Sequence, residues 1–393
     1  MANLFDYLAW RGDLPLEKIP FCELDAMILA RLSYLPLEVI VSADMAQTIT
    51  IREASDRIAV KEASEYLWKG DDRLIGMLGE SERFRHLKLS GFVNRIDEKK
   101  TMQFCALIIE LAEDLRFLSF RGTDNTLVGW QEDFNLFYEF PVPSQEEALR
   151  YFEAVYAQLG GEWLLGGHSK GGNLAVYAAV QASPKIQSRI DIVWSNDGPG
   201  FQEAFLRSEA YQALSPKIRS IVPKSSVVGM LLAHPENYQI VDSSQIGLLQ
   251  HDGLSWQIMG DHFIILPELT HESIRTERTI RSWLQKIPQE EREEFVDSLF
   301  SVLYSTGAHT LSEIRKDRMK AAAASIPALK ELPKENRDRI LEFVMLLNLI
   351  SKRLNDESKA VRTERILDKV PAFSQRSKKR KKSRATIPLS TET

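Results

Sequence analysis

The stretch that most constrains the fold is Leu164 to Ala175, which reads LLGGHSKGGNLA. A short apolar run leads into a glycine-flanked Ser169, and a helical pattern of small residues follows. This order predicts a strand, a sharp turn with Ser169 at its apex, and a helix. Glycines at 167 and 171 leave room for the backbone to close around the serine, and the first N–H groups of the helix face an oxyanion. We therefore predict that Ser169 is a nucleophile, the alternative being a glycine-rich turn that merely packs helix on sheet.

A second glycine loop follows the strand predicted at residues 115–120, in the segment that begins Arg121-Gly122-Thr123. In a hydrolase of this type, such a loop supplies one oxyanion donor, and the residue after the nucleophile supplies the other. We expect these donors to be the backbone N–H groups of Thr123 and Lys170, with the Thr123 hydroxyl as an alternative at that position.

The nucleophile needs a base and an acid, which in this chain order lie downstream as Asp or Glu and then His. Asp197 follows the strand predicted at residues 190–194, and His251 lies in a glycine-flanked loop. We predict Asp197 as the acid, with Asp242 as an alternative, and His251 as the base. His262 and then His234 are the alternatives to His251.

Three segments resemble those of class 3 lipases: Phe120-Arg121-Gly122-Thr123 with Trp130 and Asp133, the elbow Gly167–Gly172, and the loop Gly247–Gly253 with Trp256. To about residue 265 the chain is more closely similar to a bacterial family of lipase-like proteins, the Mbeg-like family. That similarity rests on an N-terminal DYL-W-RGDL segment, an NDGPGF loop and a QHD segment. The resemblance implies an α/β-hydrolase fold and makes His168 a packing residue.

Two departures from the class 3 pattern stand out. Lys170 occupies the position where class 3 lipases usually have leucine. One interpretation is a cation beside the site, which favours an anionic substrate or lowers the pKa of the serine. The other is a solvated lysine on the first turn of the helix. No carboxylate lies in the segment 223–226, where class 3 lipases place the acid. We therefore expect a serine hydrolase that cleaves a carboxylic ester or thioester without cofactor or metal. The alternative is a catalytically degenerate fold that acts as a binding or regulatory module.

The predicted architecture is α/β, with a mostly parallel central sheet, an N-terminal helical segment and a helical C-terminal region. We expect the hydrolase domain at residues 1–268, helices at 269–370, and a disordered basic tail at 371–393. A hairpin is predicted from strands 104–109 and 115–120, and C-terminal helices at 271–286, 290–304, 310–325 and 335–354.

Composition constrains the cellular compartment and the binding partners that we expect for the protein. Two cysteines, Cys22 and Cys105, exclude a disulfide framework and are expected in the core of a cytoplasmic protein. The net charge is −5, but the tail between Arg376 and Arg384 is strongly basic. We expect an ester of a small molecule or lipid as the substrate, peripheral contact of the tail with anionic membranes, and no specific nucleic-acid recognition.

Overall fold

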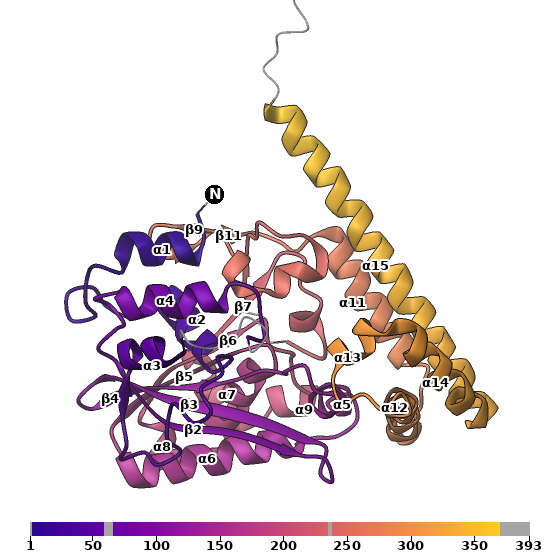
Figure 1. Ribbon diagram of the computed structural model, residues 1–393, viewed down its shortest axis with the longest axis horizontal. Coiled ribbons are helices and arrows are strands. Elements are labelled where there is room, and N and C mark those ends of the chain that lie inside the picture. Colours follow the sequence, from indigo (N-terminus) through magenta and orange to yellow (C-terminus); the bar gives the residue numbers. More distant parts are fainter. Residues whose placement is uncertain (1, 59–65, 235–237, 370–393) are drawn as a thin grey trace, which may run out of the picture.

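The computed structural model describes residues 2–58, 66–234 and 238–369 and has a nine-stranded sheet at its centre (Figure 1). The strand order is β1-β2-β3-β4-β5-β6-β7-β8-β11. The strands are β1 (Ile49–Thr50), β2 (Lys88–Asp97), β3 (Met102–Ala112), β4 (Leu115–Phe120), β5 (Glu162–His168), β6 (Ile190–Asn196), β7 (Ile218–Pro223), β8 (Tyr238–Val241) and β11 (Ile265–Leu266). A separate two-stranded sheet pairs β9 (Ile258–Met259) with β10 (His262–Phe263).

The sheet is parallel in its middle and antiparallel at both edges. Strands β4 to β8 run parallel, whereas β1 to β4 pair antiparallel and β11 pairs antiparallel with β8. The predicted hairpin is confirmed as β3 and β4. The carboxyl ends of the parallel strands share one edge, which is where open α/β sheets assemble their sites. The predicted α/β architecture with a mostly parallel central sheet is confirmed, with the parallel part confined to the central strands.

Helices cover both faces of this sheet (Figure 1). One layer contains α1 (Leu4–Arg11), α2 (Glu23–Leu32), α3 (Ile51–Ile58) and α4 (Asp71–Glu80), and the other contains α6 (Pro143–Leu159), α7 (Lys170–Gln181) and α10 (Glu209–Leu214). Neighbouring strand residues alternate between the layers, because successive side chains of a strand point to opposite faces. Phe117 and Leu164 pack into the first layer, whereas Leu118 and Leu165 pack into the second.

The C-terminal part is helical, as predicted, and comprises α11 (His271–Leu284), α12 (Gln289–Tyr304), α13 (Leu311–Lys316), α14 (Arg318–Glu331) and α15 (Lys334–Lys369). Three details differ from the prediction. The helix expected at 310–325 is divided at Asp317, which ends α13 and caps the start of α14, and α14 continues past residue 325 to Glu331 with Pro327 inside it. The last helix is also longer than predicted and extends away from the body of the molecule (Figure 1).

The remaining predictions concern the basic tail, the domain boundaries and the two cysteines. The basic tail lies outside the described residues, and the boundaries at 268 and 370 remain predictions. Both cysteines are free; Cys105 is buried, and Cys22 is partly buried against the core. None of the helices in the described ranges combines the length and the apolar character that crossing a bilayer requires.

Candidate active site

Ser169 lies at the junction of β5 and α7, with φ of 57° and ψ of −137°. A positive φ at a non-glycine residue is strained, and such strain is concentrated at functional sites. The flanking glycines are required sterically: a Cβ on Gly167 would overlap the Gly171 carbonyl group, and one on Gly171 would overlap the Phe120 carbonyl oxygen. The sequence therefore folds into the predicted sharp turn and presents Ser169 at its apex.

The structure brings Asp197 and His251 together, although they are 54 residues apart. Asp197 follows β6, and its Oδ2 lies 2.6 Å from His251 Nδ1. His251 ends the short 3₁₀ helix η4 (Gly247–His251). Because the carboxylate accepts a hydrogen bond, Nδ1 carries the proton and Nε2 is left as the basic nitrogen. Ser169 and His251 line the same cavity.

Asp197 is buried and is held at its other oxygen as well. The Ser226 hydroxyl donates to Oδ1 at 2.5 Å, and the Gly229 N–H donates to the same atom at 3.1 Å. Both donors come from the loop after β7, and the segment 223–226, where that loop begins, contains no carboxylate. That loop therefore supports the carboxylate of the preceding strand instead of supplying one.

The alternative acid and bases have other partners. Asp242 forms an ion pair with Lys224 at 2.5 Å. His262 is exposed and pairs with Asp261, and His234 Nε2 faces the Leu231 carbonyl at 3.2 Å. Burial lowers the pKa of His234 to about 4. Neither histidine lines the cavity of Ser169.

Thr123 and Lys170 line the cavity beside Ser169. The Thr123 hydroxyl donates to Asp133 Oδ2 at 2.6 Å, so at Thr123 the backbone N–H is the candidate oxyanion donor. Burial raises the pKa of Asp133 to about 6, although the nearby Lys170 ammonium opposes this shift. Lys170 is the first residue of α7, where backbone N–H groups have no acceptor within the helix.

The interpretation of Lys170 as a solvated lysine is wrong. The side chain is 1% exposed, and its Nζ donates to Glu132 Oε2 at 2.7 Å and to the Gln103 carbonyl at 3.1 Å. Glu132 belongs to α5 (Leu127–Asn135) and is fully buried. Burial of an ammonium group is tolerated only when it is paired, and here a carboxylate neutralises it. The lysine is thus neither solvated nor a free cation at the rim of the site.

Tyr34 was not predicted, yet it connects two parts of the site. Its hydroxyl accepts a hydrogen bond from the Gly122 N–H at 3.0 Å and donates to the His168 carbonyl at 3.0 Å, with His168 Nδ1 at 3.2 Å. His168 Nε2 lies 2.6 Å from the His251 carbonyl. Burial, reinforced by repulsion from His251 and Arg31, keeps the pKa of His168 well below its ordinary value. His168 is therefore a neutral packing residue, as expected.

The cavity above Ser169 has a volume of about 290 Å³ and is mostly apolar. Its walls come from the N-terminal segment, the oxyanion loop with α5, the loop after β7 and the C-terminal helices. Side chains of the last group line it at Ile280, Trp283, Leu284, Ile287, Arg292, Phe295, Val296, Phe343, Leu346 and Leu347. The C-terminal helices thus form part of the site, a role for which their sequence contains no motif. Within the described ranges no three His, Cys, Asp or Glu side chains are grouped to hold a metal.

Comparison with known proteins identifies the family. A family model described as Mbeg1-like matches residues 78–301, which is more than half of the chain. The chain therefore belongs to the Mbeg1-like family, and the predicted resemblance is confirmed; a bacterial origin remains a prediction. No curated protein matches the sequence.

Several solved lipase structures are similar to this chain in fold. A Rhizomucor miehei lipase propeptide complex aligns with a TM-score of 0.31 and 16% identity over 41% of this chain and 58% of its own, so the match spans less than two thirds of that lipase. Lip2 lipase from Yarrowia lipolytica aligns with a TM-score of 0.30 and 12% identity, over 52% of this chain and 80% of its own. A mutant form of MDLA from Penicillium cyclopium aligns with a TM-score of 0.33 and 13% identity, over 67% of this chain and 92% of its own.

Proposed function

We propose that this member of the Mbeg1-like family is a serine hydrolase that cleaves carboxylic esters or thioesters, with Ser169, His251 and Asp197 as its triad. The observation that carries the proposal is the 2.6 Å contact between Asp197 and His251 at the cavity that Ser169 lines. A buried carboxylate that fixes the tautomer of a histidine beside a strained serine turn is the arrangement needed to activate a hydroxyl nucleophile.

In the proposed reaction, Ser169 Oγ attacks the carbonyl carbon of the ester, and its proton passes to Nε2 of His251. The imidazolium is stabilised by Asp197, which Ser226 and Gly229 keep in place. The backbone N–H groups of Thr123 and Lys170 hold the oxyanion. The protonated His251 then gives its proton to the leaving alcohol or thiol, and water releases the acyl group by the same steps.

Labelling with a fluorophosphonate probe tests the nucleophile. Wild-type protein should be labelled, and Ser169→Ala should not, whereas Ser188→Ala, at an exposed serine, should react as the wild type does. Asp197→Asn should lower turnover of an activated ester by about 10³- to 10⁴-fold, because the histidine loses its orienting acceptor. Wild-type protein that is folded but not labelled would instead support the binding-module alternative.

The apolar cavity also predicts the acyl preference. Each methylene that enters it contributes about 0.8 kcal/mol, which is about fourfold in kcat/KM. With p-nitrophenyl esters from acetate to dodecanoate, we expect kcat/KM to rise with chain length and to level off once the cavity is filled. A maximum at acetate would contradict the assignment of this cavity as the acyl site.

A further inference from the structure

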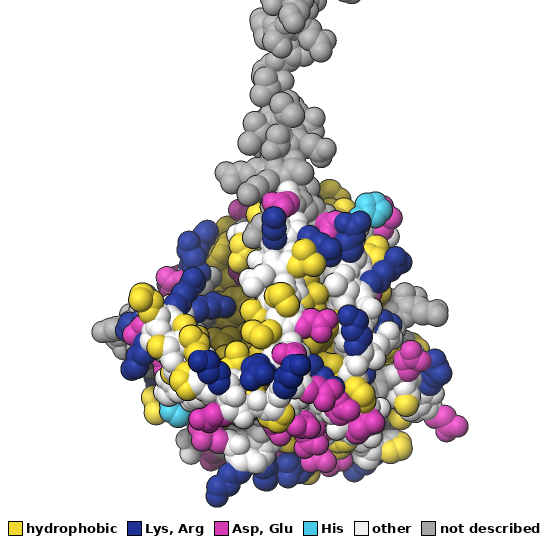
Figure 2. Space-filling model, turned by 90° about the vertical axis from the view of Figure 1, so that its right-hand side faces the viewer, with side chains coloured by type: hydrophobic (Ala, Val, Ile, Leu, Met, Phe, Trp, Pro, Cys, Tyr) yellow, Lys and Arg dark blue, Asp and Glu magenta, His cyan; other side chains and the backbone are white. Residues whose placement is uncertain are grey.

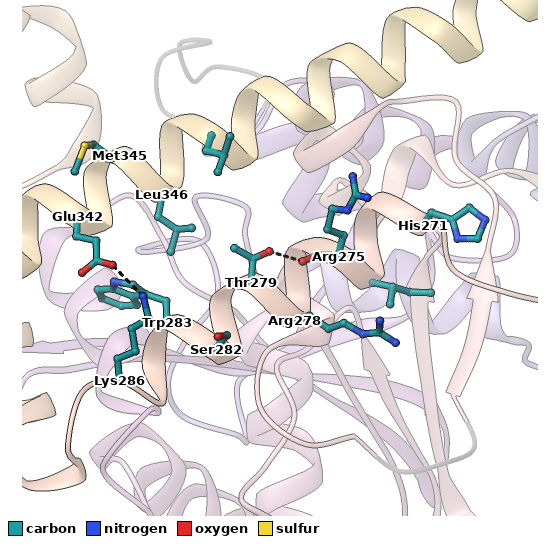
Figure 3. A pocket seen from close by; sticks show the side chains of 12 residues that line it. His271, Arg275, Arg278, Thr279, Ser282, Trp283, Lys286, Glu342, Met345 and Leu346 are labelled. Carbon is teal, nitrogen blue, oxygen red and sulfur yellow. Dashed lines mark hydrogen bonds and ion pairs between the residues drawn. The ribbon is translucent and has the colours of Figure 1, made fainter.

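A second, larger hollow lies between α11 and α15 on the outer side of the C-terminal helices (Figure 3). We call it the α11–α15 groove; it is open to solvent and has a volume of about 820 Å³. Trp283 and Leu346 line both this groove and the cavity of Ser169, so they form a shared wall between the two. The groove therefore lies next to the candidate active site without being part of it.

The floor of the groove is apolar and continues to the protein surface. Ile274 and Trp283 of α11 face Leu346 of α15 across it, and Met345 and Leu349 extend the apolar surface outward. Met345 is 65% exposed and Leu349 is 43% exposed. Figure 2 views this side of the molecule and shows a hollow with hydrophobic side chains on its floor and Lys and Arg side chains around it. Apolar side chains at such a rim gain free energy when a ligand covers them.

The edge of the groove is cationic. Arg275, Arg278 and Lys286 line it, and Glu342 is the single carboxylate among the lining residues. Lys286 reaches across to Glu342 at 3.3 Å in an exposed and therefore weak pair, and the exposed Arg275 contacts the partly buried Glu272 at 3.0 Å. Arg278 has no ion-pair partner within the described ranges, so its guanidinium is free to bind an anion.

We propose that the α11–α15 groove binds an anionic phospholipid, with its phosphate at Arg275 and Arg278 and its acyl chain along the apolar floor. Guanidinium groups bind phosphate oxygens through paired N–H donors, and Arg275 and Arg278 lie three residues apart on the same helix. A chain on the floor runs toward the wall of Trp283 and Leu346.

Calorimetric titration tests binding without turnover if the full-length Ser169→Ala variant is used. The probes are dihexanoyl-phosphatidylglycerol and dihexanoyl-phosphatidylcholine below their micelle concentrations, since single lipid molecules exclude a bilayer effect of the basic tail. We expect the anionic lipid to bind more tightly. An exposed cation–phosphate contact accounts for at most about fivefold in affinity, so Arg275→Ala with Arg278→Ala should weaken its binding about tenfold.

The matched control is Arg189→Ala with Arg207→Ala, which removes two exposed, ion-paired arginines elsewhere on the molecule. Glycerol phosphate should compete poorly if the chain contributes, and equal competition would indicate a plain phosphate site and overturn the lipid assignment. Equal affinity for the two lipids, or equal loss in both double variants, would also overturn it. Fluorophosphonate labelling of Ser169 in otherwise wild-type protein reports separately on the proposed function, so the two failures are distinguishable.

Discussion

Tyr34→Phe is a sharp test of how the site is held together. The substitution keeps the buried ring and removes only the hydroxyl, which accepts from the Gly122 N–H and donates to His168. Gly122 precedes the proposed oxyanion donor Thr123, and His168 precedes the proposed nucleophile. The hydroxyl thus joins the oxyanion loop to the nucleophile turn from a helix layer that contains no catalytic residue.

The size of the effect follows from the burial of these partners. A buried donor left without an acceptor costs about 1–3 kcal/mol, and the His168 acceptors lose their donor as well. We estimate a total loss of about 3 kcal/mol in the free energy of unfolding, a large share of the 5–15 kcal/mol typical of proteins. At about 2 °C per kcal/mol, the melting temperature should fall by about 6 °C. Release of the Gly122 N–H also loosens the oxyanion loop, so Ser169 should react with a fluorophosphonate at least about tenfold more slowly.

The control is Tyr211→Phe, at a buried ring whose hydroxyl makes no hydrogen bond within the described ranges. Thermal unfolding and the labelling rate are measured for the wild type and both variants. A Tyr34→Phe protein that matches Tyr211→Phe in both measurements would refute the reasoning. A lower melting temperature with an unchanged labelling rate would refute only the link between Tyr34 and the oxyanion loop.

Three further changes follow from the same structure. The pKa of His234 is lowered in the folded protein, so the unfolded chain binds the proton more readily than the folded one does. The stability contributed by the neutral His234 is therefore lost as pH falls from about 6.5 toward 4. Relative to the His234→Gln variant, the wild type should lose about 2 kcal/mol in its free energy of unfolding, measured in urea, between pH 7 and pH 5. The same pH dependence of this free energy in both proteins would contradict the prediction. Lys170→Met leaves the Glu132 carboxylate buried without its cation and should cost about 3–5 kcal/mol, a penalty that adding Glu132→Gln should reduce. Ser169→Gly relieves the positive φ and should raise stability by about 1 kcal/mol, which thermal unfolding would show, while abolishing labelling.

The parts of the site that the sequence predicted are those that depend on local backbone chemistry. Ser169 was recognisable because a strand, two glycines and a helix occur in a fixed order around it. Asp197 and His251 were recognisable because each follows a strand or lies in a glycine-flanked loop. Tyr34 and Glu132 gave no such signal, because their roles depend on contacts with distant parts of the chain. Tyr34 contacts His168, 134 positions further along, and Glu132 contacts Lys170, 38 positions further along. Such contacts are set by how layers pack, which local patterns do not encode.

The same limit applies to the C-terminal region. Its helices were predicted from periodicity, and three of the four predicted segments correspond to single helices. Their function was not, because an apolar face looks the same in a sequence whether it packs on a core or lines a cavity. Trp283 and Phe343 lie more than 110 residues from Ser169, and only the tertiary structure places them in its cavity.

The buried pair of Lys170 and Glu132 explains why the elbow departs from its usual sequence. A buried ion pair is seldom more stable than apolar residues of similar volume, so stability alone is a weak reason for it. Glu132 also accepts hydrogen bonds from the N–H groups of Gln103 and Ser144, at 3.0 and 2.7 Å. One carboxylate therefore joins α5, β3 and the start of α6 to the first residue of the nucleophile helix. Since the proposed oxyanion donors lie at Lys170 and in the loop that leads into α5, the pair fixes their relative position, which is the geometry that an oxyanion hole requires.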